Sequence, residues 1–266
     1  MKKTRQVLAI LGIVILVGMY VSTLIFALSN HPNSYNMLMA SIYCTIIVPV
    51  LLYAYMLAYK WFGKNPEIDT VIFDIGNVLA DYEWLDVLQD LGYDDETITA
   101  VSEAVFLSDD WPEGDRGLLS EARILQAFID NNPDYETEIR EVFAHIGDTI
   151  HTFPYADTWL DSLRQKRYRI YILSNFSEPL YKQAADKMTF LSKTNGGYMS
   201  YQVGLLKPEP AIYQKLIRNF HIDPKKAVFL DDLPENVAAA RLQGLHAIQF
   251  TSYEKAVDEL KKLGVG

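Results

Sequence analysis

The residues with the clearest capacity for chemistry stand directly after short apolar runs of the sequence. Asp74 follows Val71–Phe73, Ser174 and Asn175 follow Tyr171–Leu173, and Asp231 and Asp232 follow Val228–Leu230. Each run has the length and composition of a buried strand. In an open parallel sheet, the carboxyl ends of neighbouring strands share one crevice, where ligands bind. We therefore expect these polar side chains to converge.

Three aspartates gathered in one crevice favour a bound cation. A lone Asp at a strand end is more often a helix N-cap than a catalytic group. Asp74, Asp231 and Asp232 together would repel one another in a low-dielectric cleft unless a hard cation neutralised them. Ligand sets made only of oxygen atoms favour Mg²⁺. The sequence therefore predicts a magnesium site.

Neutral donors and a lysine complete the set. Ser174 and Asn175 supply hydrogen-bond donors for an anion, and Lys207 supplies a positive charge. A metal, neutral donors and a lysine around one carboxylate are the groups needed to bind a phosphoryl group. They also stabilise its transfer to that carboxylate.

Four segments resemble the motifs of the haloacid dehalogenase-like hydrolases, in the order in which that family carries them. They are VIFDIGNVL at 71–79, ILSN at 172–175, GLLKP at 204–208 and FLDDLPEN at 229–236. The resemblance covers nearly all of residues 68–252. The segment GDRGLLSE, at 114–121, resembles a cap segment of the sugar-phosphatase-like branch. The resemblance implies a phosphatase that uses Mg²⁺ and forms a phosphoaspartyl intermediate.

The resemblance also implies a role for each candidate residue. Asp74 would be the nucleophile, and Lys207 would pair with it and with the phosphate. Ser174 and Asn175 would bind the transferring phosphoryl oxygens. The implied magnesium ligands are Asp74, the backbone carbonyl of Gly76 and Asp232, with Asp231 as a further ligand or a residue behind the ligands.

Gly76 is a departure from the family pattern. Many members carry a second Asp at this position, two residues after the nucleophile, as general acid and base. A branch with a D-x-G-N motif, which includes sugar-1-phosphate phosphatases, resembles this chain. Without an acid, leaving groups of low pKa are favoured, so we expect a preference for sugar 1-phosphates over 6-phosphates. A water, Asp231 or a cap carboxylate such as Glu113 is the alternative proton donor.

The elements that position these residues alternate between strands and helices. Strands are expected at 70–73, 169–173, 227–230 and 247–250, and helices at 156–165, 178–187, 211–219 and 237–242. This order predicts an α/β fold with a doubly wound, Rossmann-like parallel sheet in residues 67–266. Residues 82–153 show helical patterns without clear strands, so we expect an inserted helical cap there. Trp111 and Arg116 in that cap are more simply read as a packed aromatic and a solvated charge.

The first 66 residues have a different composition. Their only charged residues are Lys2, Lys3, Arg5, Lys60 and Lys64. The uncharged stretches 7–28 and 37–59 are long enough, at about 1.5 Å per residue, to cross a membrane. We therefore expect a two-helix transmembrane hairpin. The loop 29–36 has no basic residue, so both termini and the hydrolase domain are expected to be cytoplasmic.

The charge of the remaining 200 residues limits the partners. They hold all 34 acidic residues and 19 of the 24 basic ones, which gives a net charge of −15. Such a surface repels phosphate backbones, which argues against nucleic acid and leaves a small phosphorylated substrate and the membrane as expected partners. A membrane-tethered binding or regulatory module with little turnover is the alternative function. Carbon–halogen hydrolysis is disfavoured, because it needs no metal and would not explain the Asp231-Asp232 pair.

Overall fold

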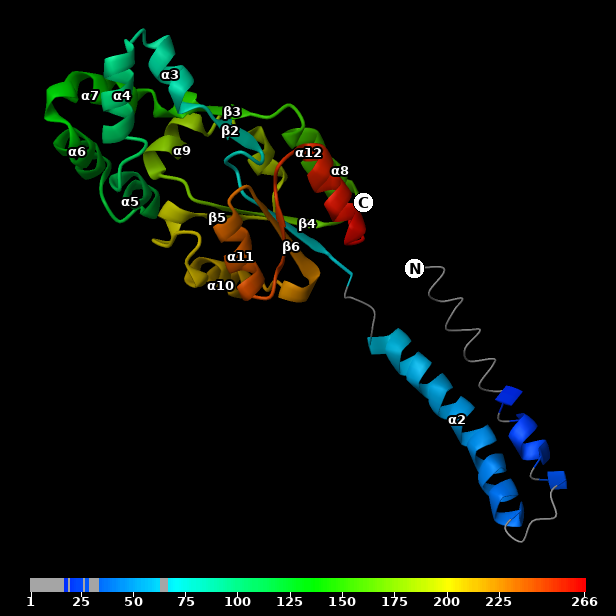
Figure 1. Ribbon diagram of the computed structural model, residues 1–266. Helices are drawn as coiled ribbons and strands as arrows, with labels where there is room; N and C mark the ends of the chain where they lie inside the picture. Colours follow the sequence, from blue (N-terminus) through cyan, green and yellow to red (C-terminus); the bar gives the residue numbers. More distant parts are fainter. Residues whose placement is uncertain (1–16, 19, 26, 29–33, 63–66) are drawn as a thin grey trace. The chain divides into compact units, whose positions relative to one another are not determined.

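The chain divides into two compact units. The computed structural model describes residues 17–18, 20–25, 27–28, 34–62 and 67–266. The units are Met1–Asn65 and Pro66–Gly266. In the first unit, helix α2 runs from Ser34 to Phe62 (Figure 1).

The prediction of a two-helix transmembrane hairpin is wrong. Within the described residues, the structure holds no helix with both the length and the apolar character needed to cross a membrane. Much of the first predicted span, residues 7–28, lies outside the described residues. The prediction counted uncharged residues as apolar, although the second span, residues 37–59, includes polar residues such as Ser41 and Thr45. The prediction of an integral membrane protein with two spans was based on the same two stretches, so it is also wrong.

A five-stranded parallel sheet forms the centre of the second unit, as the sequence predicts. The strands lie in the order β5-β4-β1-β6-β7, and every neighbouring pair is parallel. Their bounds are Thr70–Phe73 for β1, Arg169–Ser174 for β4, Gly197–Met199 for β5, Ala227–Asp231 for β6 and His246–Gln249 for β7. The central strand β1 is buried along its whole length because it has neighbours on both edges and helices on both faces.

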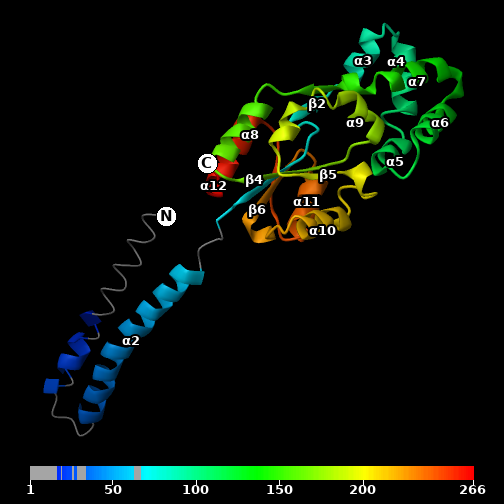
Figure 2. The ribbon, with the colours of Figure 1, turned by 180° about the vertical axis from the view of Figure 1, so that it is seen from behind.

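Helices cover both faces of the sheet (Figures 1 and 2). One face carries α8 (Ala156–Gln165) and α12 (Tyr253–Lys262), and the other carries α10 (Pro210–Asn219) and α11 (Pro234–Leu242). Alternate residues of β1 point to opposite faces, so Phe73 packs edge-on against Trp159 of α8, whereas Ile72 joins the cluster of Tyr213 on α10. This two-sided burial explains why the core strands are continuous apolar runs.

A mostly helical segment, residues 83–149, connects two short antiparallel strands, β2 (Ala80–Tyr82) and β3 (Ile150–Thr152). We call this segment the helical insertion. Its helices are α3 (Trp84–Asp90), α4 (Asp95–Ala104), α5 (Asp110–Arg116), α6 (Glu121–Asn131) and α7 (Glu136–Ala144). Aromatic contacts such as Trp111 with Phe128, at 6.0 Å between ring centroids, pack its helices together. Helix α9 (Glu178–Ala184) follows β4.

The burial of β1 predicts a large effect of a core truncation. Ile72 is fully buried, so Ile72→Ala should lower the free energy of unfolding of the full chain by about 2–5 kcal/mol. Leu242→Ala is the control, because Leu242 is 84% exposed and its truncation leaves no cavity. Urea unfolding of both variants measures the difference. Equal losses in the two variants would contradict the packing described here.

Candidate active site

The register of the sheet brings three strand ends to one level. Phe73 of β1 lies beside Ile172 of β4 and Leu230 of β6. The residues that follow therefore meet at the carboxyl edge of the sheet, where Asp74 stands between the ends of the two neighbouring strands. The Asp74 amide extends the ladder by donating to the Leu230 carbonyl at 2.9 Å. The predicted convergence is thus observed in the backbone itself.

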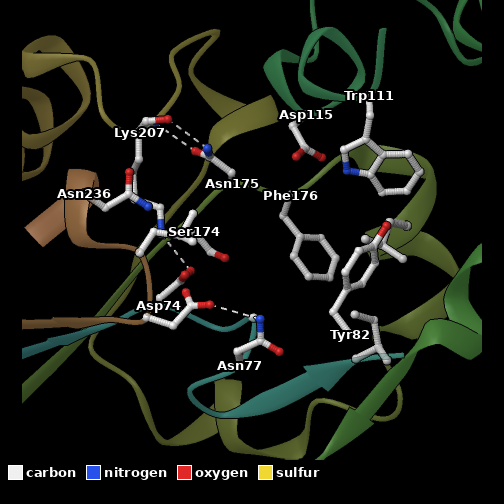
Figure 3. A pocket seen from close by; sticks show the side chains of 15 residues that line it. Asp74, Asn77, Tyr82, Trp111, Asp115, Ser174, Asn175, Phe176, Lys207 and Asn236 are labelled. Atoms are coloured by element: carbon white, nitrogen blue, oxygen red, sulfur yellow. Dashed lines mark hydrogen bonds and ion pairs between the residues drawn. The ribbon is translucent and has the colours of Figure 1, made fainter. Parts of the chain in front are cut away.

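Lys207 is the positive charge at the centre of this edge. Its Nζ lies 2.8 Å from Oδ1 of Asp74 (Figure 3). It also lies 2.6 Å from Oδ2 of Asp231, and all three side chains are buried. Burial alone would lower the pKa of Lys207, but the two carboxylates outweigh it and raise the pKa. Lys207 therefore stays protonated and holds the two carboxylates together.

Asp231 is fully engaged by the protein. Beside Lys207, it accepts hydrogen bonds from Asn236 Nδ2, at 3.0 Å and 3.2 Å to its two oxygens, and from the Leu233 amide at 2.9 Å. Its side chain has no exposed surface. This saturation indicates that Asp231 positions Lys207 and the start of α11.

Asp232 lies nearer the surface and is held by the turn that follows β1. Asn77 Nδ2 donates to Asp232 Oδ2 at 3.0 Å. Asn77 has a φ of +54°, a left-handed conformation that Asn tolerates better than most residues. The turn thereby carries Gly76 into the cavity wall beside Asp232. Burial raises the pKa of Asp232, with a further contribution from the charge of Asp231.

Asn175 lines the cavity at the site, and its carboxamide is hydrogen-bonded within the protein. Its Nδ2 donates to the Lys207 carbonyl at 2.9 Å, and its Oδ1 accepts from the Lys207 amide at 2.8 Å. Both ends of the carboxamide thus hold the backbone of Lys207. Ser174, at the end of β4, is buried and hydrogen-bonds to Asp74.

The donor set fits a magnesium ion. Ligand oxygens of Asp74, Asp231 and Asp232 lie within 4.8 Å of one another. Burial raises the pKa of Asp74 to about 7, and the charge of Asp231 adds to this effect, while Lys207 and Ser174 oppose it. Three carboxylates around one lysine leave an excess of negative charge. A divalent cation with oxygen ligands would offset that excess.

A cavity of about 210 Å³ opens from this edge towards the helical insertion. Its floor includes Asp74 and Lys207, and its far wall includes Tyr82, Trp111 and Asp115 (Figure 3). Trp111, read from the sequence as a packed aromatic, both packs against Phe128 and lines the cavity.

Sequence reasoning missed Asp115 and Tyr82. Asp115 is 8% exposed, and burial raises its pKa to about 7, with Asp74 adding to the shift and Lys207 and a Ser177 backbone hydrogen bond opposing it. The Tyr82 hydroxyl is buried and, among the described residues, has no hydrogen-bond partner. Asp115 lies within GDRGLLSE, so the resemblance of that segment was the available signal.

Glu113 and Arg116 form an ion pair with each other, and Arg116 forms a second one outside the helical insertion. Arg116 lies 3.3 Å from Glu113 and 2.8 Å from Glu209, which precedes α10. Neither residue is among those that line the cavity in the described chain. Arg116 therefore links α5 to the segment that precedes α10.

Known proteins share this sequence pattern and fold. A sequence model of the haloacid dehalogenase-like hydrolases matches residues 68–244. The chain is 24% identical to flavin mononucleotide hydrolase 1 of Arabidopsis thaliana. The matched region covers 58% of this chain and 62% of the Arabidopsis protein. The chain is 30% identical to D-ribitol-5-phosphate phosphatase of Bacteroides thetaiotaomicron over 32% of its length, and spans 44% of that protein.

A solved structure shows the same fold. It is a HAD-family enzyme, bt-2542 of Bacteroides thetaiotaomicron, in complex with magnesium and inorganic phosphate. The TM-score is 0.58 at 20% identity, over 71% of this chain and 98% of the other. At this identity the likeness concerns the fold.

The raised pKa of Asp115 predicts a pH-dependent stability. A native carboxyl with a pKa of about 7 binds its proton more tightly than the unfolded chain, where Asp titrates near about 4. Its stabilising contribution is complete below the unfolded value and is lost as the pH rises through about 7. An amide in place of this carboxyl would carry no charge, so Asp115→Asn should show a smaller fall in Tm between about pH 5 and about pH 8.

Thermal unfolding in chelator measures this difference. Asp258→Asn is the control, because the Asp258 side chain is 70% exposed, and this variant should retain the pH dependence of the native chain. An unchanged pH dependence in Asp115→Asn would show that the Asp115 carboxyl is not perturbed by burial.

Proposed function

We propose that this chain, which belongs to the haloacid dehalogenase-like hydrolase family, is a phosphatase that hydrolyses a small phosphomonoester with Mg²⁺ through a phosphoaspartyl intermediate. The observation that carries this proposal is the buried cluster at the end of β1, where Asp74 lies 2.8 Å from Lys207 beside two further aspartates. This arrangement pairs a nucleophile with the charges that phosphoryl transfer needs.

The residues divide the chemistry between them. An Asp74 carboxylate oxygen forms a bond to phosphorus as the bond from phosphorus to the leaving oxygen breaks. Lys207, held by Asp231, keeps Asp74 oriented and offers a positive charge to the phosphoryl oxygens. Ser174 donates from the end of β4. Water then hydrolyses the phosphoaspartate, releasing inorganic phosphate and regenerating Asp74.

The magnesium ion would be held by Asp74, Asp232 and the backbone carbonyl of Gly76, all of which belong to residues of the cavity wall. When bound, Mg²⁺ supplies positive charge that offsets the carboxylates and the transferring phosphoryl group. Asp231 would stand behind these ligands, because Lys207, Asn236 and the Leu233 amide already occupy its oxygens.

The substrate class we propose is a sugar or polyol phosphate, with sugar 1-phosphates among the candidates. The cavity of about 210 Å³ is smaller than typical pockets for drug-sized ligands, which measure about 300–1,000 Å³. The resemblance of the D-x-G-N motif to sugar-1-phosphate phosphatases supports this class. The similarity to a D-ribitol-5-phosphate phosphatase supports it as well.

The role of Asp74 is tested by Asp74→Asn. The amide cannot act as the nucleophile, so phosphate release should fall to background while the fold is retained. Release of inorganic phosphate from p-nitrophenyl phosphate and from a panel of phosphometabolites measures the effect. Asp258→Asn, at an exposed position, is the matched control. Substantial turnover in Asp74→Asn, with deamidation excluded by mass spectrometry, would refute the mechanism.

The metal is tested by chelation and by two neighbouring substitutions. Chelator should stop turnover and added Mg²⁺ should restore it. Asp232→Ala removes a proposed ligand, whereas Asn236→Ala removes only a partner of Asp231, so Asp232→Ala should weaken Mg²⁺ binding more. Titration of activity with Mg²⁺ compares the two variants. Full activity in chelator would disprove the magnesium requirement.

A further inference from the structure

Gly76 leaves the leaving oxygen without the acid that family members commonly place there. The question is which other group of the cavity can supply a proton. Of the carboxylates that line it in the described chain, Asp74 is the nucleophile and Asp232 is a proposed metal ligand. Asp231 is saturated by Lys207, Asn236 and a backbone amide. The remaining carboxyl on the cavity wall is Asp115.

The backbone around Asp115 is held by contacts between the helical insertion and residues that follow β5. Its carbonyl accepts a hydrogen bond from the buried Ser200 hydroxyl at 2.5 Å, and the next residue, Arg116, pairs with Glu209 at 2.8 Å. Gly117 caps the C-terminus of helix α5, and its φ of +73° and its contact with Tyr201 leave no room for a Cβ atom. These contacts hold the backbone of Asp115 at the cavity wall.

The Tyr82 hydroxyl indicates that a polar ligand group comes to the same wall. A buried hydroxyl without a partner costs about 1–3 kcal/mol. Among the described residues nothing bonds to Tyr82 Oη, although it lies close enough to Asp115 for that charge to raise its pKa. Aromatic rings surround it, including Trp111 at 5.8 Å between centroids. A leaving group with a hydrogen-bonding oxygen would satisfy this hydroxyl.

The direction of phosphoryl transfer selects this wall for the leaving oxygen. In an in-line displacement, the attacking and leaving oxygens lie on opposite sides of phosphorus. With Asp74 on the sheet edge as the nucleophile, the leaving oxygen points towards the helical insertion. Figure 3 shows Asp115 on that side, across the cavity from Asp74, with its carboxyl turned into the cavity.

We propose that Asp115 is the general acid and base of this enzyme, replacing the carboxyl that the family commonly carries at position 76. The assignment rests on the proposed function, since it needs the phosphoaspartyl route. In the first step, an Asp74 oxygen forms a bond to phosphorus while the bond from phosphorus to the leaving oxygen breaks, and the leaving oxygen takes the Asp115 proton and departs as an alcohol. In the second step, water attacks phosphorus and gives a proton to the Asp115 carboxylate. The bond from phosphorus to Asp74 breaks, and phosphate leaves.

The electrostatic surroundings support this cycle. Beside burial, the groups that shift the pKa of the Asp115 carboxyl are Lys207, Asp74 and the Ser177 backbone. Burial and Asp74 outweigh the lowering effects of Lys207 and Ser177, so the pKa of Asp115 rises to about 7. A carboxyl with this pKa can both give and take a proton near neutral pH.

This assignment changes the substrate preference expected from Gly76 alone. With Asp115 as acid, the native enzyme should hydrolyse ordinary alkyl phosphates such as glucose 6-phosphate as well as glucose 1-phosphate. The preference for leaving groups of low pKa should appear when Asp115 is removed.

The test compares the first turnover of Asp115→Asn on two classes of substrate. Glucose 6-phosphate has a poor leaving group, so its first turnover should slow by about 10²–10⁴-fold. p-Nitrophenyl phosphate needs little protonation, so p-nitrophenol should still appear in a fast burst, followed by slow steady-state turnover because the base is missing. The burst amplitude reports the fraction of folded, competent sites. Equal slowing of the first turnover on both substrates would overturn the assignment.

A double variant tests directly whether an acid at position 76 can replace Asp115. A Cβ at Gly76 would meet no atom within 4 Å, and Gly76 does not have a positive φ, so an Asp can be placed there. Asp115→Asn with Gly76→Asp should recover hydrolysis of glucose 6-phosphate at least tenfold over Asp115→Asn alone. Absence of recovery, with an intact p-nitrophenol burst, would overturn the assignment.

Two controls separate the remaining explanations. Glu113→Gln, on the same helix, should retain near-native rates because Glu113 pairs with Arg116 rather than lining the cavity. In Tyr82→Phe, KM should rise for glucose 6-phosphate with a smaller change in kcat. Selective loss on the poor leaving group in Glu113→Gln or Tyr82→Phe, rather than in Asp115→Asn, would overturn the assignment.

The native chain provides a measurement that needs no variant. Across a series of aryl phosphates, kcat/KM should depend only weakly on the leaving-group pKa, because protonation accompanies bond cleavage. A steep dependence of kcat/KM on the leaving-group pKa would overturn the role of Asp115 but not the proposed function. No phosphate release from any of these esters in Mg²⁺ would overturn the proposed function, and the assignment with it.

Discussion

The buried ion-paired lysine is the constraint on which the rest of the site depends. Taking a lysine and two carboxylates out of water is expensive unless every group is paired and hydrogen-bonded. Lys207 meets that condition because its Nζ lies between Asp74 and Asp231, while Asn175 holds its backbone from both sides. Asp231 in turn fixes the start of α11 through Asn236. The ends of β1, β4 and β6 are thus joined by one network, whose members cannot be removed singly without leaving a buried charge or donor unpaired.

The sequence predicted the sheet that carries this network because its strands are buried on both faces. Strands β1, β4 and β6 are continuous apolar runs, so their ends, and the polar residues that follow, could be located within a residue. Strands β2, β3 and β5 have three residues each, which is too short for periodicity to distinguish from a loop. The error in the N-terminal unit had another origin, because absence of charge was taken as sufficient evidence of a membrane-spanning helix.

The part of the site that the sequence could not predict depends on contacts between segments distant in the chain. Asn175 follows β4 and so was expected to face the ligand, yet its carboxamide matches the amide and carbonyl of Lys207, thirty-two residues later. Asp115 has the sequence context of a surface helix, with Glu113 and Arg116 beside it. The contacts of α5 with Ser200 and Glu209 bring its backbone to the cavity wall. Neither composition nor spacing encodes such a contact.

The two halves of the cavity are suited to different demands. In the proposed function, the sheet edge holds a phosphoryl group whose charge and shape are the same in every substrate, and its backbone ladder, buried lysine and strand-end carboxylates provide a fixed arrangement for it. The wall of the helical insertion faces the variable leaving group and is built from side chains such as Trp111 and Tyr82 on elements outside the sheet. A proton donor at position 76 would belong to the sheet edge, which holds the phosphoryl group. The proposed donor, Asp115, belongs to the wall of the helical insertion, so proton transfer depends on how the leaving group fits that wall. Selection of the substrate is therefore coupled to the chemical step.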